Sequence, residues 1–255
     1  MTVIDAFILG VLQGFTEFLP ISSSGHLVIG QQLLGLELPG NVFEVVVHVG
    51  TLLSVLVVFW KDIWRLLSTL ANKDTQFYIL ALIIGTLPAV AGGLSFKTTL
   101  EGLFDNVSLV ALALFFTGVI LMATRWIPHR DGSLSLGQGF IVGVAQMVAI
   151  IPGISRSGVT ISTGLFLGIS AEEAARFSFL LAVPAIAGAG VLTWLDLTPQ
   201  AVSSLPLSAL FTGLVSSFLM GWIALKWLLG MLASGRFYWF GVYCILVALI
   251  TLGVQ

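Results

Sequence analysis

The sequence contains little charge and only one cysteine. Of its 255 residues 58% are hydrophobic and 9% are charged, which is more apolar surface than a soluble core of this length can bury. We therefore expect the chain to lie in a membrane. The lone cysteine, Cys244, excludes a disulfide framework and a thiolate metal site, so any metal would need oxygen or imidazole ligands. The net charge of -2 provides no basic field for nucleic acid, which leaves a lipid or a small anion as the expected partner.

The N-terminal segment lacks the features of a cleaved secretory signal. Residues 1–19 have no basic start and no small-residue cleavage site, and Asp5 and Glu17 interrupt their apolar run. We expect the first helix to remain in the mature protein.

The hydrophobic runs predict an all-α integral membrane fold. Six of them are long enough to cross a bilayer as helices, at 42–60, 77–96, 107–127, 177–195, 206–229 and 237–254. Four others are too short to span and are predicted to pair as two re-entrant hairpins, at 6–19 with 27–36 and at 139–151 with 159–169. The hairpins break at 20–25 and 152–158. Irregular backbone at membrane depth is tolerated only inside protein or beside a wet cavity, so both breaks should line a cavity.

An internal repeat relates the two hairpins. When the chain is aligned with itself so that Phe7 lies opposite Phe140, identical residues face each other without a gap as far as Gly168. The matching residues of the first copy are Phe7, Ile8, Gly10, Val11, Gln13, Ile21, Ser22, Ser24, Gly25, Leu34 and Gly35. We expect two repeats, at 1–127 and 134–255, that together form one membrane domain. Each holds one hairpin and three spanning helices, an odd number of crossings, so the repeats should have inverted topology.

Basic residues predict the orientation in the membrane. One side carries Lys61, Arg65, Lys73, Arg125, Arg130, Arg176, Lys226 and Arg236, and the other carries Lys97. The positive-inside rule makes the first side cytoplasmic. Both chain termini should therefore face the periplasm.

The chemistry is divided between the repeats. In the alignment Glu17 lies opposite Ile150, Ser23 opposite Arg156 and His26 opposite Val159. The first hairpin contributes Gln13, Glu17, Ser22, Ser23, Ser24 and His26, and the second contributes Ser155, Arg156, Ser157 and Thr160. Charged residues at membrane depth are costly, so they are functional candidates.

These residue types suit a phosphate ligand. Gln13 and Glu17 are four apart on one helix face and could hold an oxygen-liganded cation such as Mg²⁺ that also bridges phosphates. Arg156 offers a planar fork for bidentate phosphate binding. The second helix of each hairpin begins at its break and directs free N–H groups and a positive dipole end to the midplane. The sequence thus predicts an anion site.

Plainer interpretations also apply. Glu17 and Arg156 could form a buried structural ion pair. Glu44 and His48, one turn apart, could extend to the membrane surface or serve a second metal or acid role, and they rank as secondary candidates. His129 lies in a charged loop and is expected to be solvated.

At these residues the chain resembles the undecaprenyl pyrophosphate phosphatase family, also called bacitracin-resistance phosphatases. The resemblance covers essentially the whole chain and is carried by QGFTEFLPISSSGH at 13–26 and PGISRSGVT at 152–160. It implies hydrolysis of the terminal phosphate of undecaprenyl pyrophosphate at the periplasmic face of a bacterial inner membrane. It also implies recycling of the lipid carrier for cell-wall synthesis, bacitracin resistance, and a divalent cation, Mg²⁺ or Ca²⁺.

The resemblance implies roles for individual residues. Glu17 is similar to the principal catalytic and metal-associated acid, and Arg156 to the pyrophosphate clamp. Ser23 and His26 are similar to nucleophile and base; we favour Ser23 with His26 assisting, and direct attack by His26 is the alternative. Gln13 replaces a glutamate of the pattern, which weakens a two-carboxylate metal site. Substrate binding is expected from Gln13, Ser22, Ser24, Ser155, Ser157 and Thr160.

A transport function is the alternative class. Inverted repeats with broken helices that meet at the midplane also characterise secondary transporters, so a lipid flippase or anion transporter would have a similar sequence. The combination of nucleophile, base, acid and anion clamp favours a hydrolase. The sequence leaves the oligomeric state open, a homodimer included.

Overall fold

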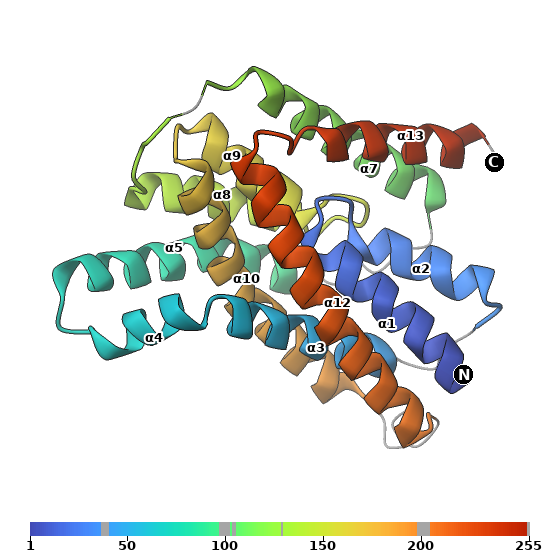
Figure 1. Cartoon of the computed structure of the whole chain (residues 1–255). Coiled ribbons are helices and arrows are strands. Elements are labelled where there is room, and N and C mark those ends of the chain that lie inside the picture. The colour runs from blue at the N-terminus through green and yellow to red at the C-terminus, as the bar shows by residue number, and fades with distance from the viewer. Residues whose placement is uncertain (37–40, 97–102, 104–105, 129, 198–204, 254–255) are drawn as a thin grey trace.

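The computed structural model describes residues 1–36, 41–96, 103, 106–128, 130–197 and 205–253, so Lys97 and His129 lie outside the described residues. Within these ranges the chain is helical and contains no β-strand (Figure 1). In chain order the helices are α1 Val3–Phe18, α2 Ser23–Leu33, α3 Val42–Val58, α4 Trp60–Ser68, α5 Lys73–Ser95, α7 Val107–Ala123, η1 Thr124–Trp126, α8 Leu136–Val148, α9 Arg156–Phe166, α10 Ala171–Asp196, α12 Leu207–Ala233 and α13 Trp239–Gly253.

The described helices confirm a multi-pass membrane protein. Four of them are long and apolar enough to cross a bilayer: α5, α7 extended by η1, α10 and α12. A fifth span results if α3 and α4, which meet at a bend of 69°, count as one crossing. The sixth expected span corresponds to α13, whose 15 residues fall short of the about 20 needed for a perpendicular crossing. Six spans therefore stay a prediction.

The first helices of the two hairpins begin in the same way. Thr2 caps α1 and Ser135 caps α8, and each forms a capping box with the residue three positions later, Asp5 and Gln138 respectively. A capping box satisfies two backbone N–H groups that a helix start leaves free. The alignment that relates the two repeats places these two caps opposite each other.

The second helices of the hairpins also correspond. Both α2 and α9 contain 11 residues, and the repeat alignment matches their first residues and their last residues. Each is followed by a glycine in the left-handed region, Gly35 with φ 64° and Gly168 with φ 83°. Glycine takes this conformation without a Cβ penalty and commonly ends helices. The repeat thus preserves where each hairpin helix begins and stops.

Small residues allow the hairpins to lie close to long helices. At Gly10 of α1 an added Cβ would come within 2.8 Å of the carbonyl oxygen of Gly213 in α12. At Gly143, the repeat equivalent of Gly10, it would come within 2.2 Å of the carbonyl oxygen of Gly85 in α5. Small residues at such contacts are typical of helix association in membranes.

The hairpins approach the centre of the molecule from opposite sides. In Figure 1 α1 and α2 lie on the right and α8 and α9 on the left, and the segments that connect each pair lie between them. The Val3 end of α1 and the Gly253 end of α13 both lie on the right, whereas the α4–α5 connection lies on the left.

Aromatic packing fixes the inner end of α1. Phe18 meets Phe179 of α10 edge to face with ring centroids 5.9 Å apart, and Phe59 stacks on Phe179 at 5.8 Å. All three rings are buried. Such contacts contribute about 0.5–1.5 kcal/mol each beyond area burial. They position the neighbouring Glu17 between α3 and α10.

Candidate active site

A cavity of about 900 Å³ lies where the two hairpins meet α3, α5 and α10. Its wall includes residues from both hairpin breaks, namely Ser22, Ser23 and Ser24 from the first and Ile154, Ser155 and Arg156 from the second, together with Glu17. This confirms the expectation that both breaks line a cavity. Because Ser23 and Arg156 are also the first residues of α2 and α9, both helix N-termini lie at this wall and favour an anion there.

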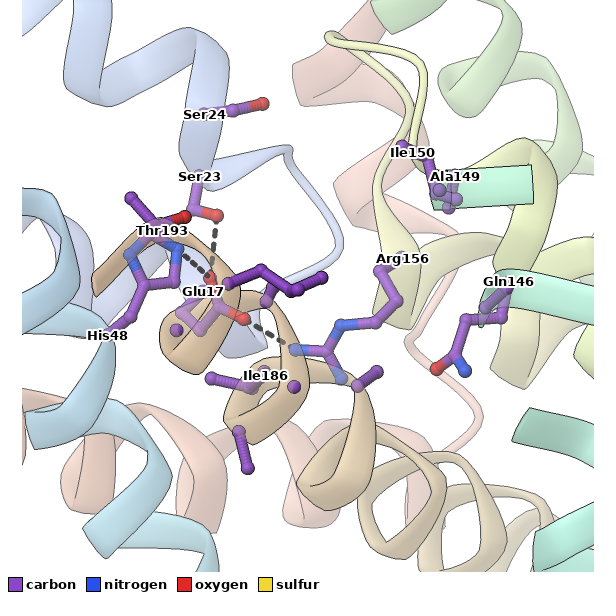
Figure 2. Close-up of a pocket in the computed structure, with 18 of the residues that line it drawn as sticks. Glu17, Ser23, Ser24, His48, Gln146, Ala149, Ile150, Arg156, Ile186 and Thr193 are labelled. Carbon is purple, nitrogen blue, oxygen red and sulfur yellow. Dashed lines mark hydrogen bonds and ion pairs between the residues drawn. The ribbon is translucent and has the colours of Figure 1, made fainter. Parts of the chain in front are cut away.

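Glu17 is the centre of the polar contacts in the cavity. Its Oε2 accepts hydrogen bonds from Ser23 Oγ at 2.7 Å and from Gln13 Nε2 at 3.1 Å. Its Oε1 accepts from Nη2 of Arg156, and the two side chains form an ion pair (Figure 2). The structural ion pair considered from the sequence is therefore present. It also connects the first hairpin to the second through one carboxylate.

His48 of α3 joins this group. Its Nε2 lies 3.8 Å from Glu17 Oε2, and its Nδ1 lies 2.7 Å from the carbonyl oxygen of Glu44. Both residues line the cavity, although Glu44 Oε1 accepts from Gln31 Nε2 at 3.3 Å and not from the central group. From the sequence His48 is a secondary candidate, because extension of its side chain to the membrane surface explains it as well as a metal or acid role does. Its one signal there is an ionisable side chain inside an apolar run.

His26 lies away from the position expected of a base for Ser23. Its Nδ1 is 2.8 Å from the carbonyl oxygen of Ser22, and its Nε2 is 2.8 Å from the hydroxyl of Tyr243 in α13. Both ring nitrogens are thus engaged elsewhere, and His26 is not part of the cavity wall. In this structure Glu17, rather than His26, accepts the Ser23 hydrogen bond.

The contact of His26 supports a strained turn. Ser22 has φ 68°, the only positive φ of a non-glycine residue in the described ranges. Such a conformation costs of order 1–3 kcal/mol and persists where the surroundings hold it. The His26 ring and the thiol of Cys244, which contacts the carbonyl oxygen of Pro20 at 3.3 Å, hold this break from either end. The first break therefore depends on α13, which supplies Cys244 and Tyr243.

The second break is held by α7 and by its own hydroxyl groups. Ser155 Oγ accepts from the backbone N–H of Gly158 at 3.2 Å and caps α9, and Ser155 N donates to Thr117 Oγ1 at 3.1 Å. Arg156 follows this cap directly, so its guanidinium leaves the helix at the cavity.

Ser157 and Thr160, which the sequence assigns to substrate binding, lie behind the wall of the cavity. Both are buried, and neither is among the residues that line it. Ser157 Oγ is 3.3 Å from Ser155 Oγ, while Thr160 Oγ1 is 2.6 Å from Ser178 Oγ of α10. Their contacts thus secure α9 rather than reach into the cavity. Ser22, Ser24 and Ser155 remain at the wall, where a substrate role stays a prediction.

The site offers oxygen donors for a cation, but it does not contain a complete set of protein ligands among the described residues. Across the described ranges no group of three His, Cys, Asp or Glu side chains could hold a metal ion. Gln13 is fully buried and its Oε1 has no hydrogen-bond partner among the described residues. Mg²⁺ commonly uses one or two protein oxygens and takes the rest from phosphates and water. Glu17 and the free oxygen of Gln13 fit that pattern in the type of donor. Glu17 lines the cavity, whereas Gln13 is not among the lining residues and contacts Glu17 through its amide nitrogen.

Sequence reasoning missed Gln146 of α8, which also lines the cavity. It is the repeat equivalent of Gln13 and is identical to it. Gln13 was a candidate because Glu17 follows it by four residues, whereas Ile150 stands at that spacing from Gln146, so Gln146 lacked this signal. The correspondence with Gln13 could have identified it.

The chain is similar to known proteins over nearly its whole length. A profile of the family described as "Bacitracin resistance protein BacA" matches residues 6–250. The chain is similar to a protein named undecaprenyl-diphosphatase from Christiangramia forsetii, with 43% identity over 257 residues, 98% of this chain and 97% of the relative. It is 44% identical to one of the same name from Rhodopirellula baltica, over 95% of this chain and 94% of the relative. A third, from Parabacteroides distasonis, is 38% identical over 99% of this chain and 98% of the relative.

Proposed function

The chain belongs to the bacitracin resistance protein BacA family, and we infer from this that it hydrolyses undecaprenyl pyrophosphate to undecaprenyl phosphate and inorganic phosphate. It is an integral membrane phosphatase. The observation that best supports this activity is the chain of contacts from Ser23 through Glu17 to Arg156 in one cavity. A hydroxyl, a carboxylate and a guanidinium therefore lie together at the junction of the two hairpins, which supports nucleophilic attack on a bound phosphate.

We propose Ser23 as the nucleophile. Its Oγ attacks the terminal phosphorus, its proton passes to Glu17 Oε2, and the bond between that phosphorus and the bridging oxygen breaks to release undecaprenyl phosphate. Water then attacks the phosphoserine, which releases inorganic phosphate and restores the hydroxyl. The hydrogen bond of 2.7 Å from Ser23 to Glu17 supports this direction of proton transfer.

Arg156 is proposed to exchange partners when substrate binds. In the structure its Nη2 donates to Glu17, and its Nη1 is buried without a hydrogen-bond partner among the described residues. A phosphate that occupies the guanidinium releases the Glu17 carboxylate to accept the Ser23 proton. The same guanidinium would stabilise charge that develops on the phosphate oxygens.

A divalent cation, Mg²⁺ or Ca²⁺, is proposed as cofactor. Glu17 and the unpaired Oε1 of Gln13 would hold it, and this fit rests on the buried amide oxygen of Gln13. When bound, the cation would offset negative charge on the pyrophosphate.

We propose that the two repeats, 1–127 and 134–255, have inverted topology with six spans and two re-entrant hairpins. The matching starts and ends of α2 and α9 and the opposite approach of the hairpins in Figure 1 support this arrangement. We propose a bacterial inner membrane location with the cavity open to the periplasm, where the enzyme would recycle the lipid carrier. The excess of basic residues on one side supports the orientation of the chain that this requires. A homodimer stays a prediction from the sequence.

The decisive experiment measures phosphate release from undecaprenyl pyrophosphate by the purified protein, with and without a chelator. We expect release that the chelator abolishes and added Mg²⁺ or Ca²⁺ restores. An Arg156→Lys variant should lose most activity because it retains the charge but not the bidentate fork. Substrate movement across vesicles without phosphate release would instead favour the transporter alternative.

A further inference from the structure

The side chain of Gln146 is buried and unsatisfied. It is 3% exposed, and neither its Oε1 nor its Nε2 has a hydrogen-bond partner within the described part of the chain. An unpaired buried amide loses its hydration without compensation, which costs stability unless water or a ligand binds it. Because Gln146 lines the cavity, that missing partner belongs in the cavity.

A second unpaired donor lies at the same wall. Nη1 of Arg156 is buried without a partner in the described ranges, whereas Nη2 of the same guanidinium is held by Glu17. In Figure 2 the amide end of Gln146 is directed towards Arg156 and lies on the side of the guanidinium opposite Glu17. The polar wall therefore runs from Ser23 through Glu17 and Arg156 to Gln146.

Apolar residues line most of the rest of the cavity. On α5 it is lined by Ala89, Val90, Gly93 and Leu94, and on α8 and just beyond it by Ala149 and Ile150. These two segments pack closely there, since a Cβ added at Gly93 would lie 3.8 Å from Ile150 Cδ1. On α10 the apolar lining includes Ala185, Ile186, Val191 and Leu192. A prenyl chain attached to a phosphate beside Gln146 would leave water against the part of this lining that α5 and α8 supply.

We propose that Gln146 and Nη1 of Arg156 bind the phosphate that remains attached to the prenyl chain. This assignment rests on the proposed phosphatase function and adds the direction in which the substrate lies. The terminal phosphate faces Ser23, and the prenyl-linked phosphate lies between Arg156 and Gln146. In Figure 2 the amide oxygen of Gln146 is nearer Arg156 than the nitrogen is. Rotation of the amide about its terminal bond brings Nε2 to that side, where it donates to a non-bridging oxygen of the phosphate. A neutral amide suits this position because it binds an anion without leaving an unpaired charge in the empty cavity.

Each reaction product should bind to only one of the two proposed phosphate positions. Undecaprenyl phosphate retains only the prenyl-linked phosphate, and inorganic phosphate corresponds to the terminal one. The test therefore measures KM for undecaprenyl pyrophosphate and the inhibition constants of both products, in the full-length protein and in Gln146→Met. Methionine has about the length of the glutamine side chain but lacks both of its polar groups.

We expect Gln146→Met to raise KM and the inhibition constant of undecaprenyl phosphate about tenfold, the scale of one hydrogen bond to a charged group. The inhibition constant of inorganic phosphate should stay unchanged. The thermal midpoint should not fall, because the variant removes an amide that the protein itself does not satisfy. Gln146→Leu should give the same pattern and serves if the methionine variant folds poorly.

Ser162 supplies the matched control. Its hydroxyl is also buried and unpaired in the described residues, but it does not line the cavity. Ser162→Ala should leave all three constants unchanged.

Three results would overturn the proposal: unchanged constants in folded Gln146 variants, a selective loss of inorganic phosphate inhibition, or an equal effect of Ser162→Ala. Failure of the wild-type protein to release phosphate would instead reject the phosphatase function. In that event the assignment is tested by equilibrium binding of undecaprenyl phosphate to the wild type and to Gln146→Met. We expect weaker binding by the variant, and equal binding would contradict the assignment.

Discussion

Ser23 donates a hydrogen bond of 2.7 Å to Oε2 of Glu17. The two residues belong to consecutive helices of one hairpin, so the geometry of the turn between them sets this contact. Gln13, one turn before Glu17, donates to the same carboxylate oxygen at 3.1 Å. The first hairpin thus contains the proposed nucleophile together with its proposed proton acceptor, and the second hairpin supplies Arg156.

Among the three serines of the first break, Ser23 should dominate activity. We expect Ser23→Ala to lower kcat by about 10³-fold or more, since the nucleophile is lost. Ser24→Ala is the matched control, because Ser24 lines the same cavity but its hydroxyl lies 3.4 Å from Ser22 Oγ rather than on Glu17. Radiolabelled substrate should leave acid-stable phosphoserine on the quenched wild-type enzyme. Acid-labile phosphohistidine together with an active Ser23→Ala protein would transfer the nucleophilic role to His26.

His26 should act through the turn rather than through proton transfer. Its Nδ1 contacts the carbonyl oxygen of Ser22, whose φ is 68°. We expect His26→Ala to reduce kcat, and we expect Ser22→Gly to recover part of that loss in the double variant. Glycine adopts positive φ without strain, so the turn no longer needs the support of the ring. The double-mutant cycle is read from kcat and from the thermal midpoint.

The same double-mutant cycle can also contradict a positioning role for His26. If His26 is the base for Ser23, Ser22→Gly will recover nothing in the His26→Ala background. Tyr243→Phe offers an independent check, because it removes the partner of Nε2 without altering the turn. A positioning role predicts a mild loss of activity in Tyr243→Phe.

His48 should support Glu17 with a smaller effect than Ser23. Its Nε2 lies 3.8 Å from Glu17 Oε2, longer than the hydrogen bond of Ser23. We therefore expect His48→Ala to lower kcat by about tenfold, within the range of a single polar interaction near a charge. Glu44→Gln is the control, since Glu44 lines the cavity but its carboxylate contacts Gln31. Equal losses in the two variants would show that the effect arises from the shape of the α3 wall.

The hairpins could be predicted from the sequence because their signals are local. Short apolar stretches, the internal repeat and serine-rich breaks indicate their positions, and the helix starts at Ser23 and Arg156 agree with those breaks. The bend of 69° between α3 and α4 gave no such signal. The run 42–60 reads as one continuous helix, and the bend occurs where Phe59 packs on Phe179, which belongs to a helix of the second repeat.

The sequence predicts which residue types the site contains, but not which side chains contact each other. Ser23 and His26 are three apart on one helix, a spacing that favours contact, yet the ring turns to Ser22 and Tyr243. That choice depends on α13, which lies at the far end of the chain. His48 and Gln146 reach the cavity from α3 and α8, and no local pattern marks either of them. Tertiary packing decides which polar residues of an apolar helix face a cavity.

Cysteine labelling tests the orientation of the whole molecule. Ala71 and Ser234 are exposed near the ends of α4 and α12, on the side that carries most of the basic residues, and Ser208 is exposed in the first turn of α12. With both termini in the periplasm, an impermeant thiol reagent should label Ser208→Cys in intact cells. Ala71→Cys and Ser234→Cys should react only after the membrane is opened. The parent protein is the control, because its single cysteine, Cys244, is buried. The reverse pattern would place the first hairpin on the cytoplasmic side and the cavity with it.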